Sequence, residues 1–232
     1  MTEPEERTVC CGLVRRMLRE DWPLLVLFAV ALVVAVALYP SLPARVPTHW
    51  NIRGEVDQWS PKAFGVFGLL GLNVGIYFLL LVVPLFDPKG ENYAKFRSTY
   101  RALRWMFGVV MTAIWGVALA AARGAKVDVS IVVPVLVSLM FVGFGNLMGR
   151  VRYNWFVGIR TPWSLANETA WRMTHRVAGK AWVLGGLISL VGAFFGGTTA
   201  AVAMGIGVGG AGIFSVAYSY FAWRRSLEGG AK

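Results

Sequence analysis

Six long apolar segments alternate with shorter polar segments along the chain. A membrane-spanning helix needs about 20 predominantly apolar residues, and these segments approach or exceed that length. Arg104, at the edge of the third, is their only charged residue. They cover residues 22–39, 63–86, 103–122, 129–149, 181–195 and 199–223. The pattern predicts an all-α integral membrane protein with a bundle of six transmembrane helices.

The composition supports the same class of protein. Of the 232 residues, 56% are hydrophobic and only 15% are charged, whereas soluble domains carry about 25% charged residues. The two cysteines, Cys10 and Cys11, are adjacent in the sequence, so no disulfide framework is expected. These values exclude a soluble domain, a disordered chain and a coiled coil.

The distribution of positive charge predicts the topology. The formal net charge is +11, which is also compatible with a nucleic-acid-binding protein, but the charges lie between the apolar segments. Of the 23 Lys and Arg residues, 18 lie before the first helix, after the second and fourth, or after the sixth. Short loops rich in Lys and Arg stay in the cytoplasm. We therefore expect both termini to be cytoplasmic and expect no direct binding of nucleic acid.

This topology divides the chain into three regions. Residues 1–21 form a cytoplasmic N-terminal arm, and residues 22–122 hold the first three helices with an outer loop at 40–62. Residues 123–232 hold the last three helices with an inner loop at 145–180.

The outer loop is predicted to be an ordered cap rather than a helix. Its four prolines exclude a regular helix, and Asn51 with Gly54 supplies turn chemistry. His49, Glu55 and Asp57 are potential metal ligands or acid–base partners, but their spacing matches no standard zinc site. The alternatives are hydrogen bonds that pin the loop, or a binding surface for an extracellular ligand. We predict no bound metal and no cofactor.

The inner loop is predicted to lead into an amphipathic helix. Asn167 or Ser164 is suited to cap this helix, which continues through Lys180 into the fifth span. Its basic stripe, formed with Arg172 and Arg176, suits the headgroups of anionic lipid without any further function. The loop also holds specific hydrogen-bonding side chains, among them a predicted Arg160–Glu168 pair, which indicate an ordered polar cluster.

Small residues mark the last two helices. Gly192 and Gly196 form one GxxxG pair and Gly205 and Gly209 another. Such pairs let helix backbones approach closely in lipid. They predict packing within the bundle, with dimerisation as the alternative.

Both loops together resemble the SdpI family of bacterial membrane proteins. The outer loop is similar to the family's domain of unknown function in its Pro-Thr-His-aromatic-Asn element at 47–51 and its Gly-x-x-Asp element at 54–57. The inner loop is similar to the second family signature, above all in the run Gly-Ile-Arg-Thr-Pro-Trp at 158–163. The six-helix plan matches as well.

The resemblance implies a function without catalysis. It implies a multi-pass protein of the bacterial cytoplasmic membrane that protects the cell from a secreted, membrane-active peptide toxin and signals to a cytoplasmic repressor. The ligand would be met by the lipid-embedded bundle and by outer-loop residues Pro47, His49, Asn51, Gly54, Asp57 and Trp59. The partner would be met by inner-loop residues Asn146, Asn154, Gly158, Arg160, Thr161, Pro162, Trp163, Glu168, Trp171, Thr174, His175 and Arg176.

Two other functions remain as alternatives. One is a transporter or lipid-handling protein that is not coupled to an ion gradient, because ionisable residues are nearly absent from the spans. The other is a membrane enzyme built around His49 or His175. The predicted topology places these two histidines on opposite faces of the membrane, which argues against a shared site.

Overall fold

The computed structural model describes residues 3–228 and is mostly helical. Six of its helices are long and apolar enough to cross a membrane, which confirms the predicted number of spans. These helices are Trp22–Ser41, Phe64–Phe86, Arg97–Ala122, Val129–Met148, Glu168–Ala193 and Gly197–Glu228.

The elements alternate between long spans and short connections. In chain order they are α1 (Glu3–Glu20), α2 (Trp22–Leu38), η1 (Tyr39–Ser41), β1 (Arg45–Trp50), β2 (Val56–Pro61), η2 (Phe64–Gly68), α3 (Leu69–Phe86), α4 (Asn92–Lys95), α5 (Arg97–Ala122), α6 (Val129–Met148), α7 (Glu168–Ala193), α8 (Gly197–Met204), η3 (Gly205–Gly209) and α9 (Gly210–Glu228). The element η1 is a 3₁₀ turn, and η2 and η3 are π-helical turns that continue into α3 and α9.

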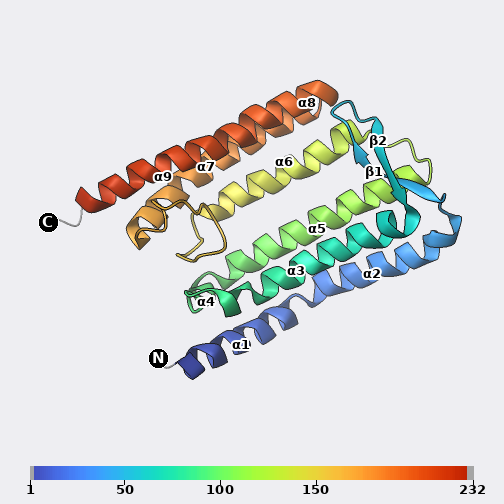
Figure 1. Cartoon of the computed structure of the whole chain (residues 1–232). Helices are drawn as coiled ribbons and strands as arrows, with labels where there is room; N and C mark the ends of the chain where they lie inside the picture. The colour runs from blue at the N-terminus through green and yellow to red at the C-terminus, as the bar shows by residue number, and fades with distance from the viewer. Residues whose placement is uncertain (1–2, 229–232) are drawn as a thin grey trace.

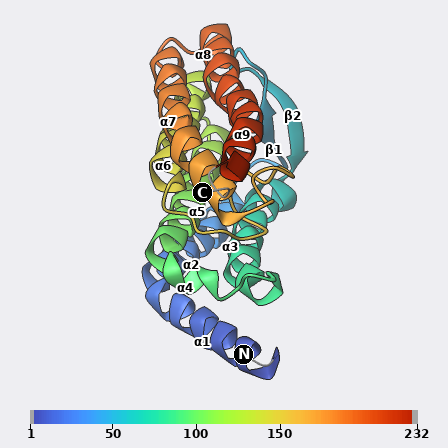
Figure 2. The same cartoon turned by 90° about the vertical axis from the view of Figure 1, so that its left-hand side faces the viewer.

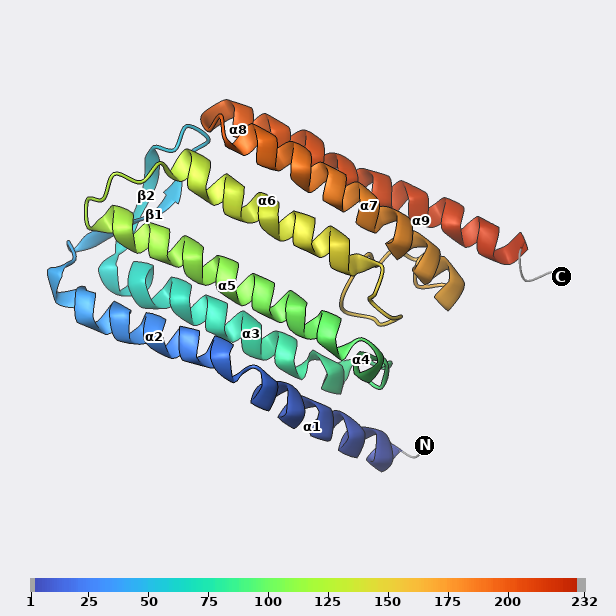
Figure 3. The same ribbon diagram turned by 180° about the vertical axis from the view of Figure 1, so that it is seen from behind.

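The spans lie side by side with their axes roughly aligned (Figure 1). The β1–β2 hairpin covers one end of the bundle, whereas both ends of the described chain lie at the other (Figures 1 and 3). The irregular segment between α6 and α7, residues 149–167, lies at this second end too. We call the two ends the hairpin end and the terminal end.

The bundle has two groups of helices (Figure 2). Helices α6, α8 and α9 each pack against α7, and α5 connects this group to α2 and α3. At the terminal end, a core of large side chains joins the groups, because it includes Met17 of α1, Tyr100 of α5 and Trp171 of α7.

The prediction of an all-α protein is wrong for the outer loop, which forms two β-strands. Strands β1 and β2 pair antiparallel, with Val46 opposite Ser60 and Pro47 opposite Trp59. The pairing is irregular beyond Pro47, which has no backbone N–H to donate. Gly54 adopts a positive φ of 79° in the turn, where a Cβ atom would lie only 2.8 Å from the Cβ of Ser130.

Helix α7 begins where the sequence predicts. The side chain of Asn167 accepts a hydrogen bond from the backbone N–H of Ala170, at 2.8 Å, and so caps the helix. The amphipathic segment and the fifth span form one continuous helix. A tight turn then leads into α8, with positive φ angles at Gly196 and Gly197.

Glycines allow close contacts between the last helices. A Cβ on Gly185 would lie 2.2 Å from the carbonyl oxygen of Gly207, and a Cβ on Gly192 would lie 2.1 Å from the Cβ of Ala203. These contacts form within the chain. Gly205 and Gly209 face open space instead, so the second predicted GxxxG pair does not make the contact between α7 and the last span.

Candidate functional site

Hydrogen bonds between exposed side chains order the hairpin. The Nδ1–H of His49 donates to the Asp57 carboxylate at 2.6 Å across the two strands. The side-chain oxygen of Asn51 accepts from the backbone N–H groups of Arg53 and Glu55, and its amide donates to the Glu55 carboxylate at 2.8 Å. This amide and the nearby Arg53 guanidinium lower the pKa of Glu55, because both favour its charged form.

A pocket lies beneath the hairpin, between it and the ends of three helices. Its volume is about 390 Å³. The hairpin contributes His49, Asn51 and Ile52 to its lining. Helices α5 and α6 contribute mainly apolar side chains, and the start of α8 contributes small residues. A mostly apolar pocket with polar groups on one side suits an apolar group that carries a polar attachment.

The carboxylates of the hairpin do not converge on one point. Asp57 faces His49, whereas Glu55 faces Asn51 and Arg53. Within residues 3–228, no group of three or more His, Cys, Asp or Glu side chains is placed to hold a metal ion.

At the terminal end, Asn154 is the centre of the loop between α6 and α7. Its side chain is fully buried. The side-chain oxygen accepts from the backbone N–H groups of Phe156 and Val157, at 2.9 and 2.6 Å, and the amide donates to the carbonyl of Arg152 at 2.8 Å. Asn154 therefore folds the loop around itself and is not available to a partner.

Asp87, which follows α3, and Tyr93 of α4 extend this network. The carboxylate of Asp87, at the end of α3, accepts from the Trp155 backbone N–H at 2.9 Å and from the Tyr93 hydroxyl at 2.8 Å. The same hydroxyl lies 3.2 Å from the Asn154 side-chain oxygen. Burial, together with the Asp87 carboxylate, raises the pKa of Tyr93, so its hydroxyl stays protonated as a donor.

His175 is also buried, with 1% of its surface exposed. Its ring stacks on Trp171 with centroids 3.9 Å apart. Its Nδ1–H donates to the Trp171 carbonyl at 2.9 Å, and its Nε2 accepts from the Ile159 backbone N–H at 3.0 Å. A carbonyl only accepts and an N–H only donates, so this pair of bonds selects the neutral ring with its proton on Nδ1.

Gly158 fits against this ring because it has no side chain. Its φ is 121°, and a Cβ atom would lie 2.3 Å from the His175 Nε2. Thr161, three residues further along, is buried, and its hydroxyl donates to Ser219 of α9 at 2.8 Å. The signature residues thus fasten the loop to α7 and α9.

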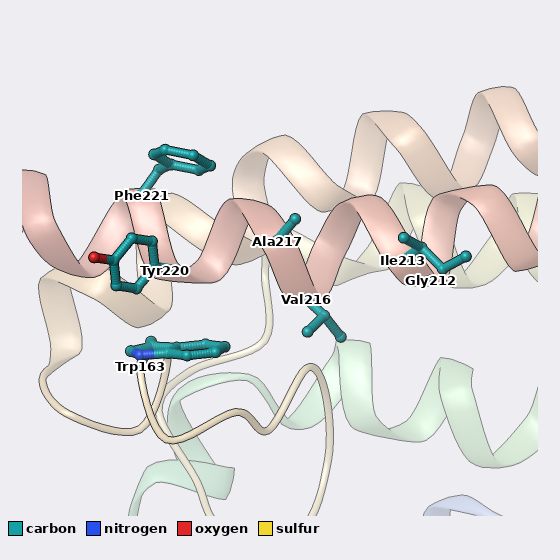
Figure 4. Close-up of a pocket in the computed structure, with 7 residues that line it drawn as sticks. All are labelled: Trp163, Gly212, Ile213, Val216, Ala217, Tyr220 and Phe221. Carbon is teal, nitrogen blue, oxygen red and sulfur yellow. The ribbon is translucent and has the colours of Figure 1, made fainter.

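Trp163 lies against α9 at the edge of an apolar groove of about 820 Å³ (Figure 4). Its ring meets Tyr220 edge to face, with centroids 5.5 Å apart. Ile213, Val216 and Phe221 complete the exposed part of the groove. These side chains lie on a membrane-spanning helix, so the groove suits lipid chains.

Most of the remaining signature side chains are exposed. Arg160 donates to the Trp155 carbonyl at 3.2 Å, in place of the predicted pairing with Glu168. The other exposed members are Asn146, Pro162, Glu168 and Arg176, whereas Trp171 and Thr174 are buried.

Four residues form a polar cluster inside the bundle that the sequence analysis did not predict, namely Asp21, Tyr77, Arg104 and Trp105. Asp21 lies between α1 and α2 and accepts from Arg104 at 2.7 Å, from Trp105 at 2.7 Å and from Tyr77 at 3.1 Å. The signal for this cluster was the charge of Arg104 inside an apolar segment, which requires a buried partner.

His49 and His175 lie at opposite ends of the bundle, on the hairpin and near the start of α7 (Figure 1). No shared site between the two histidines is formed. The geometry therefore gives no support to the enzyme alternative.

Comparisons with known proteins match both ends of the bundle. Residues 150–219, which include the loop around Asn154 and His175, match the model of the SdpI/YfhL protein family. Residues 26–74, which include the hairpin, match a domain of unknown function, DUF1648. The predicted resemblance to the SdpI family is confirmed.

One SdpI relative matches over most of its length. The immunity protein SdpI of Bacillus subtilis (strain 168) is 25% identical over 174 residues, which are 75% of this chain and 81% of the relative. No solved structure matches significantly. The chain is a multi-pass membrane protein similar to an immunity protein.

Proposed function

We propose that this chain is an immunity protein of the bacterial cytoplasmic membrane that protects its cell from a membrane-active peptide toxin. In this proposal the hairpin faces outward and both termini face the cytoplasm, in agreement with the 18 Lys and Arg residues predicted on the cytoplasmic side. The observation that carries the proposal is the pocket beneath the hairpin. It lies where a toxin approaching from outside, or from within the outer leaflet, first meets the bundle.

The chemistry of the pocket suits such a toxin. An apolar side chain of the peptide enters between α5, α6 and α8, while its backbone meets the polar groups of His49 and Asn51. Asp57 holds the His49 ring through the 2.6 Å hydrogen bond, and Gly54 lets the turn lie against Ser130. The predicted outer-loop residues thus have two roles in the proposal, namely contact with the ligand and support of the hairpin.

A survival assay tests this proposal. The chain is expressed in a toxin-sensitive bacterium, and survival is measured against purified membrane-active peptide toxins. Ala201→Phe places a ring in the pocket, whereas the matched variant Ala217→Phe places one on the exposed face of α9, away from the hairpin. We expect protection by the wild type and Ala217→Phe, and its loss in Ala201→Phe, at equal amounts of protein in the membrane.

The outcomes separate the function from the site. Absence of protection by the wild type would reject the immunity function. Full protection by Ala201→Phe would retain the function and reject the pocket as the place where the toxin binds.

The loop at the terminal end is our proposed contact for a cytoplasmic repressor. Its buried residues, Asn154 and His175, shape the loop, and exposed Arg160 with the half-exposed rings of Trp155 and Phe156 forms the surface. A reporter under the repressor's control measures this step. Arg160→Ala is expected to abolish toxin-dependent expression while protection persists. Arg152→Ala, an exposed charge in the same loop, serves as the matched control.

A further inference from the structure

A second groove, distinct from the hairpin pocket, runs between α6 and α7 at the terminal end. Its volume is about 450 Å³. Gly145 and Gly179 form its floor, because a Cβ on either residue would lie 2.7 Å from the carbonyl oxygen of the other. The two helices therefore meet backbone to backbone at these glycines, and the groove lies over this contact, between the side chains that flank it.

Two cations line one part of this groove. Arg176 and Lys180 lie one turn apart on α7, and both are exposed. Neither forms an ion pair with any acidic side chain that the structure describes; the acidic partners of described ion pairs are Glu20, Asp21, Glu55 and Asp57. Asn146 of α6 adds an exposed amide on the facing side. This part of the groove therefore has two positive charges and a hydrogen-bond donor without a partner among the side chains that the structure describes.

The other part of the groove is apolar. Leu184 and Leu187 line it, with 61% and 45% of their surfaces exposed. Leu187 lies roughly 16 Å further along the α7 axis than Arg176, at 1.5 Å per residue. The groove thus passes from basic to apolar over a distance comparable with half the thickness of a bilayer's hydrocarbon core.

We propose that this groove binds one anionic phospholipid, with its phosphate at Arg176 and Lys180 and an acyl chain along Leu184 and Leu187. Basic pockets between transmembrane helices bind anionic headgroups in this way. A soluble acidic protein segment would neutralise the cations but would leave the leucines without a partner. A zwitterionic lipid brings a cation of its own and is bound more weakly.

Lipid titration of the purified full chain in detergent, followed by native mass spectrometry, tests the site. The probes are phosphatidylglycerol and phosphatidylcholine with identical acyl chains. We expect phosphatidylglycerol to bind more tightly. The double variant Arg176→Gln with Lys180→Gln is expected to bind it roughly 30-fold more weakly, because each positive charge increases the affinity about fivefold. The matched control, Arg224→Gln with Arg225→Gln, removes two exposed charges from α9 at the same end and is expected to leave the affinity unchanged.

Two further variants test the shape and the apolar part of the groove. Gly149 lies at the rim of the groove, and its backbone is in the right-handed helical region that any residue can adopt. A Cβ atom there would meet only the Arg176 Cα, at 3.9 Å. Gly149→Leu therefore fills the groove while retaining both cations, and it is expected to weaken phosphatidylglycerol binding. Leu184→Ser is expected to weaken it as well, because it removes apolar contact with the acyl chain.

Three results would overturn the proposal. One is equal affinity for the two lipids, and another is an equal loss of affinity in the Arg176/Lys180 variant and the Arg224/Arg225 control. The third is displacement of phosphatidylglycerol by a soluble hexaglutamate peptide together with normal lipid binding by Leu184→Ser, which would identify an acidic protein segment as the occupant.

Discussion

The carboxylate of Asp21 and the guanidinium of Arg104 form an ion pair at 2.7 Å, and neither side chain is exposed. Asp21 lies at the junction of α1 and α2, and Arg104 lies on α5. The Tyr77 hydroxyl and the Trp105 ring N–H also donate to Asp21, so the two charges are both paired and hydrogen-bonded. This arrangement satisfies the condition under which a buried ion pair is tolerated.

Removal of one partner should destabilise the bundle strongly. Arg104→Ala leaves the Asp21 carboxylate buried without its counter-charge, and we expect a loss of about 3–5 kcal/mol in the free energy of unfolding. The measurement is SDS titration in mixed micelles, followed by tryptophan fluorescence. Arg101 lies on the same helix as Arg104 and is an exposed partner of Glu20. Arg101→Ala should therefore lower the free energy of unfolding by at most about 1 kcal/mol. Equal losses in the two variants would contradict the prediction.

Gly158→Ala should open the loop between α6 and α7. The substitution adds a Cβ at a φ of 121°, within 2.3 Å of the His175 ring, so the Ile159 N–H loses its acceptor or the backbone moves. We expect faster tryptic cleavage after Arg152 and Arg160 in the purified protein. Gly149→Ala, which meets no close neighbour, is the control, and an unchanged cleavage rate in Gly158→Ala would show that the ring does not hold the loop.

Asp87 and Asn154 should be energetically coupled. Both lie within hydrogen-bond distance of the Tyr93 hydroxyl, and both accept from successive backbone N–H groups of one loop. In a double-mutant cycle with Asp87→Ala and Asn154→Ala, we expect an interaction energy of about 0.5–3 kcal/mol. Asp128 caps α6 at the far end of the bundle. Asp87→Ala and Asp128→Ala should therefore be additive within about 0.5 kcal/mol.

The turn of the hairpin should loosen in acid. The folded-state pKa of Glu55 lies below the ordinary value of 4.5 because Asn51 and Arg53 favour its charged form. The stabilisation is therefore present above pH 4.5 and is lost as the pH falls through the lowered pKa. Backbone amide exchange at Gly54 and Glu55, measured by NMR and divided by the intrinsic exchange rate at each pH, should rise as the pH falls through this range. The Glu55→Gln variant should not show this pH-dependent rise in exchange. In Asn51→Ala, the midpoint of the rise should move toward pH 4.5.

The sequence was sufficient to predict the spans and the start of α7. A helix in lipid must be apolar over its whole length, so the six spans are visible without any tertiary information. The Asn167 cap is a local signal, because its partner is only three residues away.

The polar clusters were not predicted because their partners are distant in sequence. Asp21 was assigned to a cytoplasmic arm, and its partner Arg104 to the edge of a span, although 83 residues separate them. The sequence analysis placed Asn154 and His175 among the partner contacts of the inner loop. Their burial, which changes their expected role from partner contact to loop support, depends on α3, α4 and α7 together.

The hairpin and the glycine contacts show a second limit. Prolines excluded a helix from the outer loop. The pairing of its two strands depends on a register that the alternation of polar and apolar residues in 40–62 does not set by itself. The Gly205–Gly209 pair had the spacing of a packing motif, yet Gly207 makes the contact with Gly185. Spacing identifies glycines on one helix face, and only the partner helix selects which face is used.

The bond between the Asp87 carboxylate and the Trp155 backbone has a consequence for how such proteins can recombine. Asp87 lies between the two segments that match family models, and Trp155 lies inside the second. Part of the interior of the second segment is therefore formed by a stretch of chain that neither family model covers. A chimera that joined the first half of one relative to the second half of another would have to keep an acceptor at position 87 and the path of the loop backbone at 155, whereas this bond leaves the side chain at 155 free to vary.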